Sequence, residues 1–215
     1  IHHVLELVKL TESNPKIWFS DPTWGNHLTI AKHLNMPVGK YSYFNNETRA
    51  VDFEEMVSDL SKVSNGDIVV LHGCCHNPTG ANLNKDQWNI IADLLLEKEA
   101  IPFIDIAYQG FGEGIEEDAF GTRLLASKFP EMFIAASCSK NFGIYRERCG
   151  IVITVSKNPD ISSITQGNLS YVNRQNFSFP PDHGARLVTM VLTDTELRAD
   201  WISELEQVRI GMLDA

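Results

Sequence analysis

The chain has 215 residues, of which 43% are hydrophobic and 21% are charged, a composition typical of folded proteins with a sizeable core. Its formal net charge of −10 argues against nucleic acid or an anionic membrane as a partner, because both carry negative charge. Apolar runs such as residues 101–106 are far shorter than the roughly 20 residues that span a bilayer, so no transmembrane segment is expected.

The start of the sequence has the pattern of a helix interior. Ile1, Val4, Leu5, Val8 and Leu10 recur at helical spacing, and no capping residue stands before them. The basic segment and small-residue cleavage site of a signal peptide are missing. We therefore expect the sequence to be a piece of a longer chain.

Strand and helix patterns then alternate along the chain. Runs of apolar and β-branched residues predict strands, and amphipathic periods predict the helices between them. Strands are expected at residues 16–20, 38–44, 67–72, 101–105, 132–137 and 150–155. Helices are expected at 27–34, at 52–63 with Asp52 as cap, at 86–99, at 118–128, and in two stretches after Pro180-Pro181, the second from about Asp194.

This alternation favours an α/β fold in which a mostly parallel sheet is flanked by helices on both faces. The last predicted helix carries Trp201, Leu205, Val208 and Met212 on one face and has no stop signal at its end. We expect it to continue beyond the given sequence.

The cysteines indicate a reducing compartment. Cys74, Cys75, Cys138 and Cys149 lack the spacing of a disulfide framework, so free thiols are expected. The adjacent pair with His76 does not match the spacing of zinc ligands. We therefore predict no metal site.

Polar segments directly follow three of the predicted strands. In open α/β sheets ligands bind beyond the carboxyl ends of the strands, so these segments are expected to border one site. They are His-Gly-Cys-Cys-His-Asn-Pro-Thr-Gly at 72–80, Asp-Ile-Ala-Tyr-Gln-Gly-Phe at 105–111 and Ser-Cys-Ser-Lys-Asn-Phe-Gly at 137–143.

Asp105 and Lys140 are the two residues in these segments with the most specific chemistry. A carboxylate in an apolar strand needs a cation or several donors, although an Asp that caps a following helix is an open alternative. Lys140 follows 140 − 105 = 35 residues later. A strand–helix–strand unit of about 30 or more residues returns it to the same rim. A lysine and an Asp are the pair that pyridoxal phosphate requires, one for a Schiff base and one for the pyridine nitrogen.

The three segments resemble signatures of the class I aminotransferases, and within them the aspartate aminotransferase subgroup, in the same order and spacing. The similarity runs over almost the whole chain. It implies a pyridoxal-phosphate-dependent transferase of fold type I, with residues 1–193 in the large domain and 194–215 as the start of an interdomain helix. The family's Ser-Gly-Thr segment would precede Ile1, and its small domain, with the arginine for the substrate α-carboxylate, would follow Ala215. We therefore expect the 215-residue piece, truncated at both ends, to have little or no turnover.

The resemblance implies a role for each matching residue. Lys140 would carry pyridoxal 5'-phosphate as a Schiff base and, once freed, move the proton between the substrate α-carbon and the cofactor C4′. Asp105 would pair with the pyridine nitrogen. Asn77 and Tyr108 would hydrogen-bond the phenolic oxygen, Tyr108 counting with Lys140 and Asp105 among the catalytic residues.

Four further positions complete the implied cofactor site. Ser137 and Arg148 would hold the phosphate, Arg148 as a two-pronged donor. Trp24 would stack on the ring and, with Asn77, contact the substrate, although a tryptophan taken alone favours a core position. His27 would support Asp105 from behind, or would only begin a helix.

Arg174 matches the arginine that, in this subgroup, reaches the neighbouring subunit's site and binds the substrate's distal carboxylate. Its alternative is a solvated arginine. The match implies a homodimer and dicarboxylate substrates. Phe179 departs from the family pattern, in which an Asn stands before Pro-Pro, so the contact with the neighbouring subunit is expected to differ in detail.

These implications lead to the hypothesis of an aspartate aminotransferase that moves an amino group between L-aspartate and 2-oxoglutarate, with amino-acid and 2-oxo-acid substrates. The alternatives are an aromatic-amino-acid aminotransferase of the same subgroup and a non-catalytic protein with this fold. Burying so many charged groups without a cofactor would be costly, which argues against the last alternative. A cytoplasmic location is expected, with the mitochondrial matrix also open.

Overall fold

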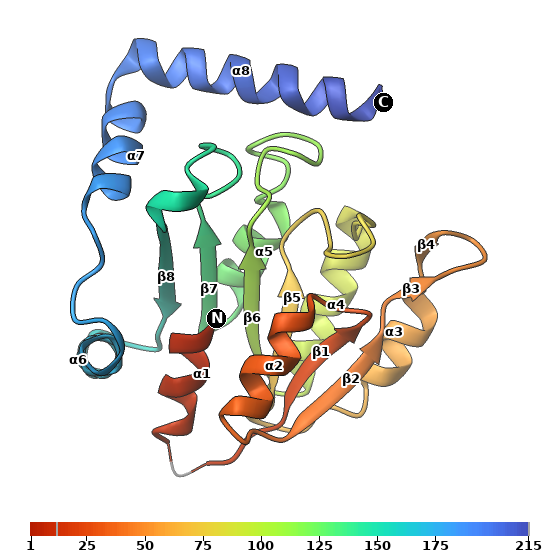
Figure 1. Cartoon of the computed structure of the whole chain (residues 1–215). Helices are drawn as coiled ribbons and strands as arrows, with labels where there is room; N and C mark the ends of the chain where they lie inside the picture. The colour runs from red at the N-terminus through yellow and green to blue at the C-terminus, as the bar shows by residue number, and fades with distance from the viewer. Residues whose placement is uncertain (12, 215) are drawn as a thin grey trace.

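The computed structural model describes residues 1–11 and 13–214, and its elements follow the predicted alternation (Figure 1). The strands are β1 (Ile17–Asp21), β2 (Val38–Ser42), β3 (Phe44–Asn45), β4 (Ala50–Val51), β5 (Ile68–His72), β6 (Ile101–Ile106), β7 (Met132–Ser137) and β8 (Gly150–Val155). The helices are α1 (His2–Lys9), α2 (Gly25–His33), α3 (Phe53–Leu60), α4 (Lys85–Glu97), α5 (Phe120–Lys128), α6 (Pro159–Asn176), α7 (His183–Thr193), α8 (Thr195–Leu213) and the short 3₁₀ helix η1 (Tyr145–Glu147).

Six strands form one sheet in the order β2-β1-β5-β6-β7-β8. Neighbouring strands are parallel from β2 to β7, whereas β8 runs antiparallel to β7. The expected mostly parallel α/β fold is therefore confirmed. Because β5, β6 and β7 are parallel neighbours, the three polar segments that follow them emerge at the same edge of the sheet.

Alternating side chains of the strands supply two cores, one on each face of the sheet. On one face, residues such as Val69 and Ile104 pack with α3, α4 and α5. On the other face, Val70 and Phe103 pack with the apolar side of α1 and with α2. The central strands β5 and β6 thus bury both of their faces, as expected for parallel strands with near-continuous apolar sequences, whereas the edge strands β2 and β8 keep exposed residues.

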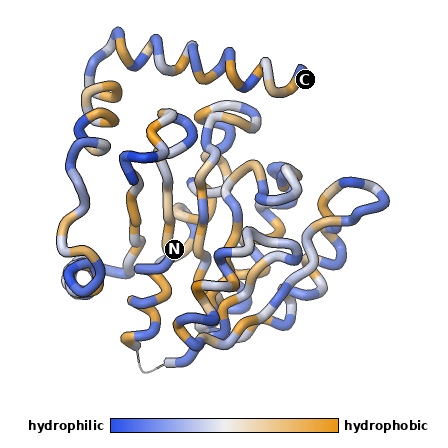
Figure 2. The backbone as a smooth tube through the Cα atoms, in the orientation of Figure 1, coloured by the Kyte–Doolittle hydropathy of each residue, from blue (hydrophilic) through white to orange (hydrophobic). Residues whose placement is uncertain are grey.

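The long helix α6 was not among the predicted elements. Asn158 caps it by accepting a hydrogen bond from the backbone N–H of Ile161, and Pro159 occupies its first turn. Val172 is its one buried residue among those described, and Figure 2 shows the helix, viewed end on, as largely hydrophilic. Because the apolar pattern of α6 is weak, its capping residues were the main sequence signal of this helix, and periodicity did not predict it.

Two smaller expectations also need correction. Asp52 stands at the N-cap of α3, but its side chain makes no capping hydrogen bond. The segment predicted as one strand from 38 to 44 divides into β2 and the hairpin strand β3, which pairs with β4 through Phe44 and Val51.

Helix α8 crosses above the carboxyl ends of the central strands (Figure 1). The Trp201 indole N–H donates to the Asn141 carbonyl at 2.6 Å, and its ring stacks on Phe142 with 4.4 Å between centroids. Leu205 is buried, but Val208 and Met212, predicted on the same face, are 46% and 63% exposed. The first half of the apolar face is thus covered, and the assignment of residues 194–215 to an interdomain helix stays a prediction.

Within the described ranges, no helix has both the length and the apolar character needed to cross a membrane.

Candidate active site

A cavity of about 1340 Å³ lies at the edge of the sheet where β5, β6 and β7 end. Eight of the nine predicted site residues line it, and the ninth, His27, lies directly behind one of them. The lining residues among the predicted set are Trp24, Asn77, Asp105, Tyr108, Ser137, Lys140, Arg148 and Arg174.

Asp105 lies near the end of β6 and is held from behind by His27. The His27 Nε2–H donates to the Asp105 Oδ2 at 2.9 Å, and the histidine is fully buried in the first turns of α2. Burial opposes ionisation of Asp105, but the hydrogen bond from His27 opposes this effect, and the pKa of the carboxyl is lowered. In the part of the chain that the structure describes, the second oxygen, Oδ1, has no hydrogen-bond partner. An ionised carboxylate therefore presents a free acceptor to the cavity.

A series of hydrogen bonds continues from His27 to the segment after β5. Thr23 Oγ1 lies 2.9 Å from His27 Nδ1 and 3.4 Å from His72 Nε2. At the far end, the backbone N–H of Asn77 donates to His72 Nδ1 at 3.3 Å. Asn77 and Asp105, on adjacent segments, are thus joined through three intervening side chains.

The donors and acceptors in this series follow from its first member. Burial lowers the pKa of His72 to about 4, so its ring is neutral near pH 7. Since Nδ1 accepts from the amide of Asn77, the ring proton is on Nε2 and is donated to Thr23. The Thr23 hydroxyl then donates to His27 Nδ1, which leaves the His27 Nε2–H for Asp105.

His76 fixes the same segment from its other side. Its ring nitrogens lie 2.9 Å from Ser20 Oγ and 2.8 Å from Thr79 Oγ1, and the ring stacks on Tyr43 at 3.9 Å between centroids. Burial lowers the pKa of His76 to about 3. A neutral, buried imidazole therefore ties the loop that carries Asn77 to β1.

Lys140 lies in the turn after β7 and points to the segment after β6. Its ammonium lies 4.6 Å from the ring centroid of Tyr108, a cation–π distance. The turn is closed by the N–H of Gly143, which donates to the Lys140 carbonyl at 3.0 Å, and Gly143 has the positive φ of 65° that favours glycine. Asn141 also donates to the Gln109 carbonyl at 3.2 Å. The two segments are thus held against each other around the lysine.

Ser137 and Arg148 lie at the other end of the cavity, where β7 and β8 pair. Ser137 stands opposite Gly150 in the register of these strands, and its Oγ accepts from the N–H of Ser139 at 3.2 Å. Arg148 follows η1 with a φ of 53° and donates to the Tyr145 carbonyl at 3.0 Å. Unlike Asp105, this arginine is exposed. A hydroxyl and a guanidinium near one strand end can hold an anion.

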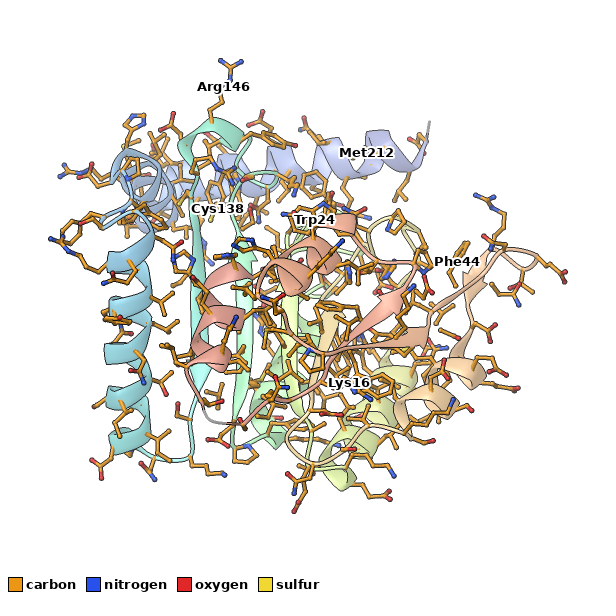
Figure 3. All side chains as sticks on the ribbon, turned by 60° about the horizontal axis from the view of Figure 1, so that its bottom comes forward. Lys16, Trp24, Phe44, Cys138, Arg146 and Met212 are labelled. Atoms are coloured by element: carbon orange, nitrogen blue, oxygen red, sulfur yellow. The ribbon has the colours of Figure 1, made fainter. Side chains whose placement is uncertain are left out.

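Trp24 is not a core residue. It stands at the N-cap of α2, is 39% exposed and meets His27 edge-on at 5.2 Å between ring centroids (Figure 3). The alternative of a core tryptophan is therefore wrong, and the indole is available to a planar ligand in the cavity.

Arg174 lies in the last turn of α6 and lines the cavity of its own chain. Its guanidinium donates to the Ser178 hydroxyl and lies 5.8 Å from the ring centroid of Phe179, which is 79% exposed. Its predicted reach into a neighbouring subunit stays a prediction.

The cysteines are all free thiols in the structure. Cys74, Cys75 and Asp118 place one potential ligand atom each within 4.8 Å of one another. The carboxylate of Asp118, however, already accepts hydrogen bonds from three backbone N–H groups, those of Gly110, Gly112 and Glu113. These hydrogen bonds give Asp118 a structural role in holding the loop. The absence of a metal site stays a prediction.

No role was predicted from the sequence for Thr23, His72 or His76. Two signals were available: Thr23 and His27 are four residues apart at the start of a helix, and His72 ends a predicted strand. Neither spacing alone shows that the two histidines meet through a threonine.

Comparison with known proteins identifies relatives over nearly the full chain. The family model for aminotransferase class I and II matches residues 2–214. The aromatic-amino-acid aminotransferase of Paracoccus denitrificans is 55% identical over 99% of this chain and 54% of its own length. The aspartate aminotransferase of Haemophilus influenzae is 40% identical over 95% of this chain and 52% of its own length.

A solved structure agrees in fold. The aromatic-amino-acid aminotransferase from Burkholderia pseudomallei, covalently bound to pyridoxal phosphate, superposes with a TM-score of 0.95 and 38% identity. The match covers 98% of this chain and 53% of that one. The chain thus spans about half the length of the relatives it matches.

Proposed function

Because the chain belongs to the class I and II aminotransferase family, we propose that the full-length protein is a pyridoxal-phosphate-dependent aminotransferase. One observation carries this proposal: Asp105, ionised and braced by buried His27, lines the same cavity as Lys140. A relative of the same fold is covalently bound to pyridoxal phosphate.

The residues around the cavity fit this cofactor in their chemistry. A carboxylate with a free oxygen suits a protonated ring nitrogen, an exposed indole suits a planar ring, and a guanidinium suits a phosphate. When bound, pyridoxal phosphate supplies an aldehyde that an amine can hold covalently and a ring that withdraws electrons from the substrate α-carbon. The residues with these roles are Asp105, Trp24 and Arg148, with Ser137 assisting at the phosphate.

Asp105 would keep a proton on the ring nitrogen of the bound cofactor, because its own pKa is lowered and it remains the acceptor. His27 holds the carboxylate in place and donates to its other oxygen. Thr23 and His72 fix the orientation of the His27 ring in turn. Together these residues would keep a proton on the ring nitrogen of the bound cofactor.

With the cofactor bound, Lys140 would hold its aldehyde and would carry a proton to and from the substrate α-carbon. Tyr108, whose ring lies under the Lys140 ammonium, hydrogen-bonds the cofactor's phenolic oxygen together with Asn77. Asn77 is positioned for this by His72 and His76, which hold its loop. Asn77 and Trp24 also contact the substrate.

We propose aromatic amino acids as the preferred amino donors. The support is the 55% identity to an aromatic-amino-acid aminotransferase, against 40% for an aspartate aminotransferase.

Aspartate, with 2-oxoglutarate as acceptor, is the second candidate, and Arg174 favours it. A guanidinium can bind a distal carboxylate as a two-pronged donor, and the family resemblance assigns this role to Arg174. In this proposal the arginine serves the neighbouring subunit of a homodimer. We place the protein in the cytoplasm or the mitochondrial matrix, since four free thiols suit a reducing compartment.

The cofactor proposal is tested by the visible absorption of the full-length protein purified with pyridoxal phosphate. We expect a band that changes with pH and with an added amino donor. Lys140→Ala should abolish the pH-dependent band, whereas Lys157→Ala, at an exposed position after β8, should keep it. An unchanged spectrum in Lys140→Ala would refute the role of this lysine.

Substrate preference is tested by kcat/KM with tyrosine, phenylalanine and aspartate, each with 2-oxoglutarate. We expect both aromatic donors to exceed aspartate. Higher kcat/KM for aspartate would establish the second candidate instead, and Arg174→Ala should then lower it far more than the value for phenylalanine.

A further inference from the structure

Two cysteines face each other where β7 and β8 leave the sheet. The antiparallel register pairs Ser137 with Gly150, so the next pair along the two chains is Cys138 and Cys149. The N–H of Cys138 donates to the Cys149 carbonyl at 3.1 Å, which extends the pairing by one step. Cys138 lies at the upper end of β7 in Figure 3.

This placement suits a covalent bond between the two sulfur atoms. Directly opposite residues in antiparallel pairs project to the same face, with Cα atoms about 4.5–5.5 Å apart. A disulfide accommodates Cα separations of about 4.4–6.8 Å, a range that includes this spacing.

Both thiols are accessible to small molecules. Cys149 lines the active-site cavity, and Cys138 lines a second cavity of about 620 Å³ beneath α8. Both side chains are half-buried.

The two cysteines differ in their readiness to react. Burial, the neighbouring Cys149 and the hydrogen bond to its thiol raise the pKa of Cys138 to about 11. Cys138 is therefore held as a thiol near neutral pH, and we assign the first reaction to Cys149, which lines the larger cavity.

We propose that Cys138 and Cys149 form a reversible dithiol–disulfide site whose oxidant is a peroxide. The Cys149 sulfur attacks one oxygen of hydrogen peroxide, the O–O bond breaks, and a sulfenic acid forms while hydroxide leaves and takes up the thiol proton as water. The Cys138 sulfur then attacks the sulfenic sulfur, the S–O bond breaks, and the oxygen leaves with the Cys138 proton as a second water. Two thiols lose two electrons and two protons, and one peroxide becomes two waters.

The disulfide would close a covalent loop of the chain that contains Lys140 and Arg148, the two residues that we assign to opposite parts of the cofactor. Lys140 and Arg148 lie between Cys138 and Cys149 in the chain, within one turn and the helix η1. Oxidation would thus tie together the two ends of this segment without removing either side chain from the cavity.

The site is tested on the full-length, cofactor-loaded protein treated with hydrogen peroxide at equimolar concentration. We expect a loss of two hydrogen atoms in the intact mass, reversed by dithiothreitol. Trypsin cleavage without reduction, after denaturation and removal of the cofactor, should yield residues 129–140 and 149–157 as one cross-linked peptide pair. Both Cys138→Ser and Cys149→Ser should lose this product, and Cys75→Ser, which changes another half-buried thiol, should retain it.

A different product would overturn the inference. Such products are peptides 129–140 and 149–157 recovered unlinked after peroxide treatment, each thiol oxidised separately to a sulfinic acid, or a link to Cys74 or Cys75. The measurement does not depend on the proposed function. A protein that shows the cofactor band but no cross-link refutes the dithiol site alone, and one with the cross-link but no band refutes the cofactor role alone.

Discussion

The two ends of the active-site cavity are built in different ways. At the Asp105 end, the carboxylate is braced by a fully buried histidine and, through it, by Thr23 and His72. At the Arg148 end, the guanidinium is exposed and donates to a carbonyl of its own loop. The first end is organised before any ligand arrives, because buried polar groups there already have their partners. The second end depends on its ligand to engage Arg148.

The largest expected effect is at the organised end. Asp105→Asn removes the charge at nearly constant shape and leaves His27 without its anionic partner. Removing one preorganised electrostatic partner from a reacting group typically lowers kcat by about 10²–10³, so we expect a fall in kcat of roughly a hundred- to a thousandfold. Steady-state kinetics of the full-length protein measures it, with Asp21→Asn, an exposed aspartate at the end of β1, as control. A tenfold loss or less would place Asp105 outside the chemistry.

At the Arg148 end, we expect substitutions to weaken cofactor binding rather than to lower kcat. Arg148→Ala removes charge-assisted hydrogen bonds worth about 1.5–3 kcal/mol, so the Kd for pyridoxal phosphate should rise roughly ten- to a hundredfold. Arg148→Lys should recover part of the lost affinity, since lysine keeps the charge but not the two-pronged geometry. Arg146→Ala is the matched control, because this neighbour projects away from the molecule (Figure 3).

Equilibrium dialysis of the cofactor separates these outcomes. If Arg148→Ala kept its affinity and lost kcat instead, the division between the two ends would be wrong.

The buried histidines make the organised end sensitive to acid. Their pKa values fall to about 4 for His72 and about 3 for His76 in the folded protein, below the unfolded value of about 6.5. Between these limits the unfolded state binds more protons, so the free energy of unfolding decreases as pH falls from about 6.5. Each histidine should remove about 2 kcal/mol between pH 7 and pH 5.

Urea unfolding at the two pH values measures this slope. His76→Phe, which keeps an aromatic ring against Tyr43, should flatten it by about 2 kcal/mol, whatever the stability of the variant at pH 7. His33→Gln, at an exposed position on α2, should leave the slope unchanged. An unchanged slope in His76→Phe would show that this histidine is not buried in its neutral form.

The smallest effect is expected from the middle of the hydrogen-bond series. Thr23→Val keeps the shape and removes the hydroxyl between His72 and His27, at a cost of about 1 kcal/mol, or roughly fivefold in kcat. Thr29→Val removes an exposed hydroxyl from α2, the helix that carries His27, and should have no effect. Equal kcat values for the two variants would mean that His27 needs no support from Thr23.

The sequence predicted the sheet and the main site residues because both depend on local patterns. Strand runs ending in polar segments placed Asp105 and Lys140 at one rim, and the sheet order brings the segments together. The support behind Asp105 could not be predicted in the same way. Thr23 and His72 are 49 residues apart and meet only because β1 and β5 are neighbours in the sheet.

Helix α6 shows the opposite limit. Its cap at Asn158 and its proline were readable, but with Val172 as its one buried residue among those described, it lacks the apolar stripe by which a packed helix is recognised. Its outer side chains include the apolar Ile164 and Tyr171, which are 64% and 57% exposed. Periodicity therefore predicts elements that pack against the core and misses those that do not.

The backbone N–H of Asn77 fixes the direction of the hydrogen bonds along the whole series, as far as Asp105. A main-chain N–H cannot become an acceptor, and no change of the Asn77 side chain, proline apart, removes it. To invert the polarity of the series, His72, Thr23 and His27 would all have to exchange donor for acceptor, and two N–H groups would then meet at His72. In this series Asp105 can therefore only accept a hydrogen bond and cannot donate one. The constraint comes from the backbone and not from any single side chain.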